Sequence, residues 1–171
     1  MSDIEVQIYN LEAKARFIIG DKDTANELLD ELLRRSQNLS MMDKFKAFEV
    51  KILIAQTRNN FDEAISLALD LWRQLKNKPI PTRVSKIAIL KEYMKVNRAV
   101  RGLSSEDLAA LPFATDERVI IRQRIIELIE PSCYQANPNM FVLIQLKLTA
   151  DAVKHGWVSG LPLIGFGLLL W

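Results

Sequence analysis

The chain has 171 residues, of which 49% are apolar and 26% are charged, and its formal net charge is +2. These totals are ordinary for one globular domain with a core, and they exclude wholesale disorder. The small net charge gives no argument for a nucleic-acid partner by itself. The single cysteine excludes a disulfide framework and indicates a reducing, cytoplasmic setting.

The first helical hairpin is predicted over residues 4–36. A helix over 4–19 ends at Gly20, and Asp23 caps a second helix over 24–36. The apolar positions that recur at helical spacing, and that we expect to face inward, are Ile4, Ile8, Leu11, Ala15 and Ile18 in the first helix and Leu28, Leu29, Leu32 and Leu33 in the second.

A second hairpin is predicted over residues 42–76, with helices over 42–57 and 62–75 and a turn at Asn59-Asn60. Its expected inward positions are Phe45, Phe48, Ile52, Ala55, Ile65, Leu69 and Trp72. The turn beginning at Gly20 aligns with Asn59, an offset of 39 residues. A constant offset between hairpins is typical of an α-solenoid, and this offset is longer than the roughly 34 residues of a tetratricopeptide (TPR) repeat.

The second half of the chain continues with helices separated by prolines and glycines. Pro79 and Pro81 break the pattern, and further hairpins are expected over 83–130 and 138–171. The first expected helix covers 83–101 and is ended by Gly102, and a short helix from Ser104 or Ser105 to Leu111 follows it. The next begins at Thr115 or Asp116 and runs to Glu130, where Pro131 either kinks it or starts the next turn. The last begins at Asn137-Pro138 and is ended by Gly156.

The uncharged segment 157–171 has two interpretations. We prefer a buried repeat helix, because 15 residues fall short of the roughly 20 that span a bilayer. The alternative is a membrane-associated tail. The expected fold is therefore all-α: a right-handed α-solenoid of stacked TPR-like hairpins, open at its C-terminal end, forming one incomplete repeat region over 1–171.

The residues with reactive side chains have structural explanations that we prefer to functional ones. His155 precedes a helix-ending glycine, and Cys133 is expected to be buried. The carboxylates Glu127 and Glu130, and Glu106 and Asp107, suit solvated faces and helix caps better than metal binding or acid-base chemistry. The sequence therefore predicts no catalytic, cofactor-binding or metal site.

A basic stripe marks the helix expected over 83–101. It consists of Lys91, Lys95, Arg98 and Arg101, with Glu92 as the opposing acid. The apolar side of that helix is predicted to carry Ile89, Leu90, Tyr93, Val96 and Val100. We prefer a solvated face of an amphipathic helix, and the alternative is a surface for an anionic partner, namely nucleic acid, an acidic protein or a phospholipid surface.

Residues 60–171 contain short motifs whose order and spacing resemble those of a known family. The motifs are Leu111-Pro112, Thr115-Asp116, Pro131, Tyr134, Ala136-Asn137-Pro138, Phe141 and His155-Gly156. They resemble the TPR-like helical region of large bacterial multidomain sensor kinases. In those proteins a Ser/Thr-kinase-like domain and a STAND/AAA ATPase domain precede this region, and a GAF domain and a histidine kinase of the two-component type follow it.

The resemblance implies a non-catalytic scaffold that couples the domains of a signalling kinase, so that this chain is a part of a larger protein with protein partners. After Gly156 the chain departs from the family, because Trp157-Val158-Ser159 replaces a polar turn. No Walker A motif, kinase glycine-rich loop or His-Arg-Asp loop is present, so ATP binding and phosphotransfer fall to no residue here. The alternatives are a free-standing TPR-like adaptor for a peptide or helix, and a module that binds membrane through residues 157–171 or nucleic acid through the basic helix.

Overall fold

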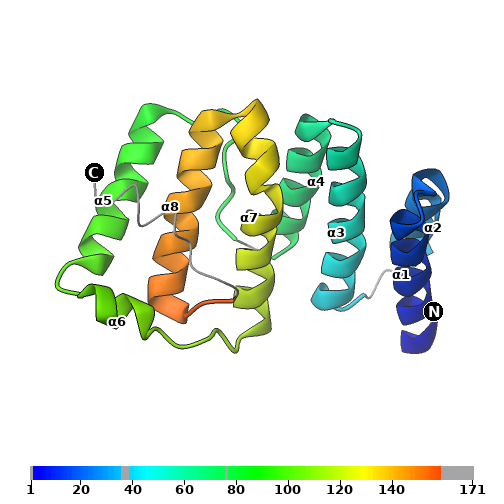
Figure 1. Ribbon diagram of the computed structural model, residues 1–171, viewed down its shortest axis with the longest axis horizontal. Helices are drawn as coiled ribbons and strands as arrows, with labels where there is room; N and C mark the ends of the chain where they lie inside the picture. Colours follow the sequence, from blue (N-terminus) through cyan, green and yellow to red (C-terminus); the bar gives the residue numbers. More distant parts are fainter. Residues whose placement is uncertain (1, 36–38, 76, 159–171) are drawn as a thin grey trace. The chain divides into compact units, whose positions relative to one another are not determined.

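The computed structural model describes residues 2–35, 39–75 and 77–158. Within these ranges the chain forms eight α-helices and no β-strand (Figure 1), which confirms the all-α class. The chain divides into two compact units, which we call unit 1 (Met1–Pro79) and unit 2 (Ile80–Trp171).

Unit 1 consists of two helical hairpins. The first joins α1 (Asp3–Ile18) to α2 (Lys22–Arg35), and the second joins α3 (Met41–Thr57) to α4 (Phe61–Gln74). The two helices of each hairpin pack on each other, and α3 also packs on α1 and α2. The ion pairs Lys51–Asp30 and Arg58–Asp23 link α3 to α2 across this contact.

The two hairpin turns have the same backbone hydrogen-bond pattern and a residue with positive φ at the same position. In the first, the amide of Asp21 donates to the carbonyl of Arg16 at 2.9 Å, and Gly20 has a φ of 91°. At the aligned position of the second, the amide of Asn60 donates to the carbonyl of Ala55 at 2.9 Å, and Asn59 has a φ of 56°. Both are helix ends of the Schellman type, in which a residue with positive φ closes a six-residue hydrogen-bonded ring. The predicted turns are thus confirmed.

The predicted inward positions of α2, α3 and α4 are confirmed, since all are buried except Leu28 and Leu33, which pack against the core while half-buried. The predicted cap of α2 is wrong. Asp21, and not Asp23, accepts the hydrogen bond from the amide of Thr24, at 3.3 Å, while Asp23 lies inside the helix. The cause is that the Schellman turn already places Asp21 one residue before the helix begins.

The predicted inward face of α1 is also wrong. Ile4, Leu11 and Ile18 are 70%, 68% and 72% exposed, and Ile8 is 54% exposed. The helix buries the opposite face, on which Val6, Asn10 and Ala13 lie inside and Tyr9 and Phe17 pack on the core. The helix carries apolar residues on both faces, and the buried one is interrupted by an asparagine, so the more regular stripe was the misleading one.

Unit 2 contains α5 (Lys86–Val100), α6 (Ser105–Ala109), α7 (Glu117–Ala136) and α8 (Pro138–His155). The last helix, α8, packs on both α5 and α7 and lies between them (Figure 1). The sequence had grouped α5 with α7 in one hairpin over 83–130, whereas the helix contacts of this unit are those of α8. An extended segment leads into α5, and the side chains of Asn137 and Asn139, at the start of α8, donate to the carbonyls of Thr82 and Val84.

The helix ends of unit 2 follow the sequence closely, with two exceptions. The predicted caps Ser104, Asp116 and Asn137 are confirmed. The helix expected from residue 83 begins at Lys86 because Ser85 caps it. Of the two alternatives for Pro131, the start of a new turn after Glu130 is wrong, since α7 continues through Pro131 to Ala136. The helix predicted within 157–171 lies outside the described residues, apart from Trp157 and Val158. No described helix combines the length and the apolar character that crossing a membrane requires.

Candidate functional site

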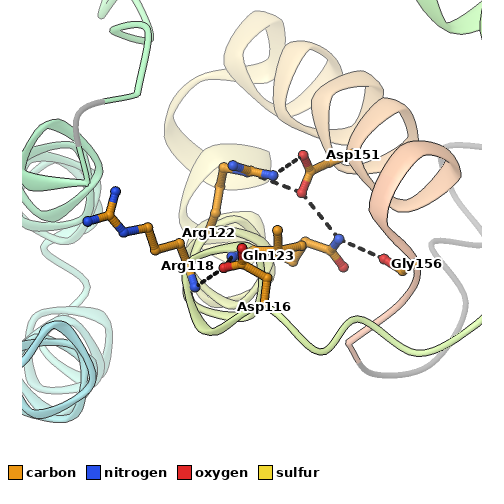
Figure 2. A network of polar contacts seen from close by, with 7 residues as sticks. Asp116, Arg118, Arg122, Gln123, Asp151 and Gly156 are labelled. Atoms are coloured by element: carbon orange, nitrogen blue, oxygen red, sulfur yellow. Dashed lines mark hydrogen bonds and ion pairs between the residues drawn. The ribbon is translucent and has the colours of Figure 1, made fainter.

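The most connected polar cluster of unit 2 joins α7 to α8 (Figure 2). The guanidinium of Arg122 donates to both carboxylate oxygens of Asp151, and its Nε lies 3.1 Å from Asp151 Oδ2. The fully buried amide of Gln123 donates to the same carboxylate oxygen at 3.2 Å and to the carbonyl of Gly156 at 2.9 Å. One carboxylate on α8 therefore holds two consecutive side chains of α7.

The backbone next to this cluster forms a second link. The amide of Trp157 donates to the carbonyl of Pro112 at 2.9 Å, and the amide of Ala114 donates to the carbonyl of Trp157 at 2.6 Å. Gly156 has a φ of 90°, and a Cβ atom there would lie 2.3 Å from the carbonyl oxygen of Pro112. Only glycine fits at this position. It allows the segment after α8 to pair with the segment before α7, where Phe113 and Trp157 lie side by side.

The beginning of α7 completes the cluster. Asp116 Oδ1 accepts hydrogen bonds from the amides of Arg118 and Val119, at 2.7 and 3.3 Å, and so caps the helix that carries Arg122 and Gln123 (Figure 2). The charges of Arg122 and Asp151 neutralise each other in a bidentate pair, a geometry that fixes position more than it activates a group. What this arrangement does chemically is to fasten the beginning of α7 to the end of α8.

A second polar contact lies where α5 meets α8. Glu92 is buried and its carboxylate lies 2.9 Å from Lys95 Nζ and 3.6 Å from Lys147 Nζ of α8. Glu92 therefore opposes the basic stripe through Lys95, but it does so from a buried position that also faces α8. A buried carboxylate needs a nearby cation, and here Lys95 of α5 and Lys147 of α8 both supply one.

Cys133 and His155 take the structural positions expected of them. The Cys133 thiol is fully buried in α7, and burial, with a smaller contribution from Glu130, raises its pKa to about 12. His155 is the exposed last residue of α8. Within the part of the chain that the structure describes, no hydrogen bond or ion pair joins the thiol to the imidazole, so the geometry does not assemble a thiolate–imidazole pair of the kind that nucleophilic cysteines use.

The four carboxylates that the sequence offered as candidates also have structural surroundings and do not come together in a site. Asp107 accepts hydrogen bonds from the amide and hydroxyl of Ser104 in a capping box, and these bonds lower the pKa of its carboxyl group. Glu106 is exposed beside it, while Glu127 and Glu130 are half-buried on α7. Among the described residues, no group of three or more His, Cys, Asp and Glu side chains is placed to hold a metal ion.

The basic stripe of α5 is exposed as predicted, but the face beside it is not the one expected. Lys91, Lys95, Arg98 and Arg101 face solvent. Of the predicted apolar side only Val96 is buried, while Leu90 and Tyr93 are exposed. Two further apolar residues, Ile87 and Met94, are exposed on the same helix. The outer face of α5 is therefore basic and apolar together.

The sequence reasoning did not find Arg122, Gln123, Asp151 or Lys147. A weak signal exists in hindsight, because Gln123 and Asp151 interrupt apolar stretches of α7 and α8 at positions that face another helix. A buried polar residue at such a position usually has a hydrogen-bond partner, but that partner lies 28 residues away and only the fold identifies it.

Comparison with protein-family models, with curated proteins and with solved structures finds no match for this chain. The assignment of a function therefore depends on the geometry described above and on the motifs of the sequence.

Proposed function

We propose that this chain is a non-catalytic helical-repeat scaffold, a TPR-like α-solenoid region that couples the domains of a multidomain sensor kinase. Its role is to hold and relay the position of neighbouring domains through rigid contacts between helices, with ATP binding and phosphotransfer performed elsewhere in the kinase. The observation that carries the proposal is the repeated hairpin of unit 1.

The repetition extends from the turn to the whole second helix of each hairpin. Helices α2 and α4 have 14 residues each, and their first residues, Lys22 and Phe61, are separated by the same offset as the two turns. The hydrogen bond from Thr24 to Asp21 has its counterpart, at that offset, in the bond from Glu63 to Asn60. Equal helices joined by equal turns are the building units of solenoids, in which each hairpin buries its apolar face on the next.

Several residues on which the kinase resemblance depends take structural roles. Asp116 and Asn137 cap helices, and Gly156 permits the backbone pairing with Pro112. The rings of Tyr134 and Phe141 meet edge to face, with centroids 5.5 Å apart, where α7 passes into α8. Motif residues that form junctions rather than a pocket support a scaffold more than an enzyme.

The repeat interpretation is tested by exchanging equivalent positions of the two turns. Asn59→Gly should preserve or raise stability, because glycine adopts a positive φ without strain. Gly20→Asn should be tolerated, since Asn59 already has a positive φ at the equivalent position. Gly20→Val is the matched disruptive variant, because a β-branched residue is strained there. If Gly20→Asn destabilised the protein as much as Gly20→Val in urea denaturation, the two turns would not be equivalent and the repeat would be rejected.

The kinase context is tested separately by sequencing the DNA on both sides of this reading frame. We expect an ATPase pattern upstream or a GAF or histidine-kinase pattern downstream in the same frame. An isolated gene would contradict the coupling role and leave the repeat scaffold intact, in favour of a free-standing adaptor.

A further inference from the structure

Two helices of the described chain each expose a continuous apolar ridge. On α1 the ridge consists of Ile4, Ile8, Leu11, Ala15 and Ile18, the face that the sequence pattern had placed in the core. On α5 it consists of Ile87, Leu90 and Met94, which are 66%, 57% and 51% exposed. Single exposed apolar residues are normal on a protein surface, but ridges of this kind mark interaction sites.

The spacing of both ridges is that of a coiled-coil seam. The α1 residues follow one another at intervals of four, three, four and three, and the α5 residues at intervals of three and four. In heptad notation these residues occupy positions a and d, which insert between the side chains of a facing helix. Each ridge is therefore shaped to receive a second helix.

The e flanks of the two ridges carry opposite charges, while the g flanks carry one lysine each, Lys14 on α1 and Lys86 on α5. Beside the α1 ridge, the exposed Glu5 and Glu12 occupy the e positions. Beside the α5 ridge, the exposed Lys91 and Arg98 occupy the e positions, with Lys95 next to them. The acid of α5, Glu92, is buried and pairs with Lys95 and with Lys147 of α8, so Lys91 and Arg98 supply the positive charge of this flank. Charges at e and g positions select the partner and the orientation of a coiled coil.

We propose that the α1 face of one copy of this chain docks antiparallel on the α5 face of a second copy. In an antiparallel arrangement the e positions of one helix face the e positions of the other, so that Glu5 and Glu12 meet Lys91 and Arg98. A parallel arrangement would place the acids against the opposite flank of α5, where Lys86 is the single cation. A contact between two α5 faces, or an antiparallel contact between two α1 faces, would place like charges against each other and is disfavoured.

The contact is heterologous, because it joins two different surfaces, and each copy keeps one unused face for a further copy. One helix from each copy makes an interface at the small end of the specific range, below about 1,200 Å² in total. We therefore expect weak, reversible association that grows with concentration and, because of the flanking charges, declines with added salt.

The experiment is sedimentation of the full chain and of two blocked variants. One variant blocks α1 (Ile8→Asp with Leu11→Asp), and the other blocks α5 (Leu90→Asp with Met94→Asp). All four positions are exposed, so both variants should retain the helical circular-dichroism spectrum and the urea midpoint of the parent chain. Phe113→Asp, at another exposed apolar residue, is the matched control and should associate like the parent.

We expect the parent chain to gain mass between micromolar and millimolar concentration and each blocked variant to remain monomeric. An equimolar mixture of the two variants should form a species of twice the chain mass and no larger, because it retains one α1 face and one α5 face that can meet. Reversing the charges in one copy (Glu5→Lys with Glu12→Lys) should abolish association, and Lys91→Glu with Arg98→Glu in the other copy should restore it.

Three results would overturn the proposal. A parent chain that stays monomeric at millimolar concentration has no such contact. An α1-blocked variant that still associates by itself uses another surface. Binding of the monomeric parent to vesicles of phosphatidylserine, lost in the α5-blocked variant, would assign the α5 face to an anionic membrane instead.

Discussion

Asp151 of α8 accepts hydrogen bonds from two consecutive residues of α7, with Arg122 Nε at 3.1 Å and Gln123 Nε2 at 3.2 Å. The side chains of Arg122 and Asp151 are 20% and 16% exposed, so water screens their attraction only in part. Removal of the carboxylate would leave a nearly buried guanidinium without its counter-charge.

We expect Asp151→Ala to lower the free energy of unfolding by about 2–3 kcal/mol, less than for a fully buried pair because both groups still reach solvent. Asp23→Ala is the matched control. Its carboxylate also pairs with an arginine on another helix, Arg58, but is 91% exposed, so its loss should cost no more than about 0.5 kcal/mol. Urea denaturation measures both, and equal losses would show that burial does not strengthen the Arg122–Asp151 pair.

Gly156 and Gly102 have the same φ of 90° but different surroundings. A Cβ atom at Gly102 meets no heavy atom within 4 Å, so Gly102→Ala should cost only the strain of a positive φ, about 1–2 kcal/mol. Gly156→Ala adds the collision with the carbonyl of Pro112 and should cost about 3 kcal/mol or more. Urea midpoints of the two variants give the difference. Similar losses would mean that the backbone pairing of Pro112 with Trp157 does not persist in solution.

Burial makes the Cys133 thiol a poor nucleophile, since its pKa of about 12 leaves almost no thiolate at neutral pH. We expect the native chain to resist alkylation by iodoacetamide at pH 8 and to react readily in urea. The lone thiol supplies its own control, because labelling in the two conditions reports on one residue. Rapid labelling of the folded chain would show that α7 opens around Cys133.

The same shift predicts the direction of a pH effect on stability. The pKa of the folded state lies above the ordinary value of 9.0, so the folded state retains its proton where the unfolded state has lost it. The contribution to stability is therefore complete below pH 9 and is lost as the pH rises through about 12. Cys133→Ala should show a shallower loss of stability between those two pH values than the parent chain.

Asn10 is buried in the apolar contact between α1 and its neighbours, and within the described part of the chain neither atom of its amide has a hydrogen-bond partner. An unsatisfied buried amide is costly, so Asn10→Leu should raise the free energy of unfolding by about 1 kcal/mol. Gln7→Leu, on the exposed part of the same helix, should change it by less than about 0.5 kcal/mol. A destabilised Asn10→Leu variant would indicate that the amide has a bound water or another partner in solution.

The sequence predicted those features of the fold that depend on neighbouring residues. The helix caps at Ser104, Asp116 and Asn137, and the turns at Gly20 and Asn60, follow from hydrogen bonds between residues close together in the chain. Within the described residues, the order of the helices was predictable for the same reason.

Features that depend on distant contacts were not predictable. The face of α1 was misjudged because two apolar stripes compete on one helix, and the packing of α2 and α3 decides between them. Proline usually ends a helix, yet α7 continues through Pro131 to the junction where Asn137 caps α8. The partners of Asp151 and Glu92 across the helix contacts, Arg122 and Lys147, lie on other helices far along the chain, and no local pattern specifies such pairs.

The central place of α8 in unit 2 has a consequence for synthesis on the ribosome. Each hairpin of unit 1 joins helices that follow each other directly, so α1 and α2 can pair as soon as they emerge. Among the described helices of unit 2, α5 packs chiefly on α8, which is made after α6 and α7. The amphipathic α5 must therefore wait, with its inner face unsatisfied, until the chain has been extended to His155. Nascent chains that stop before α8 should expose this helix to chaperones, while their first two hairpins are already folded.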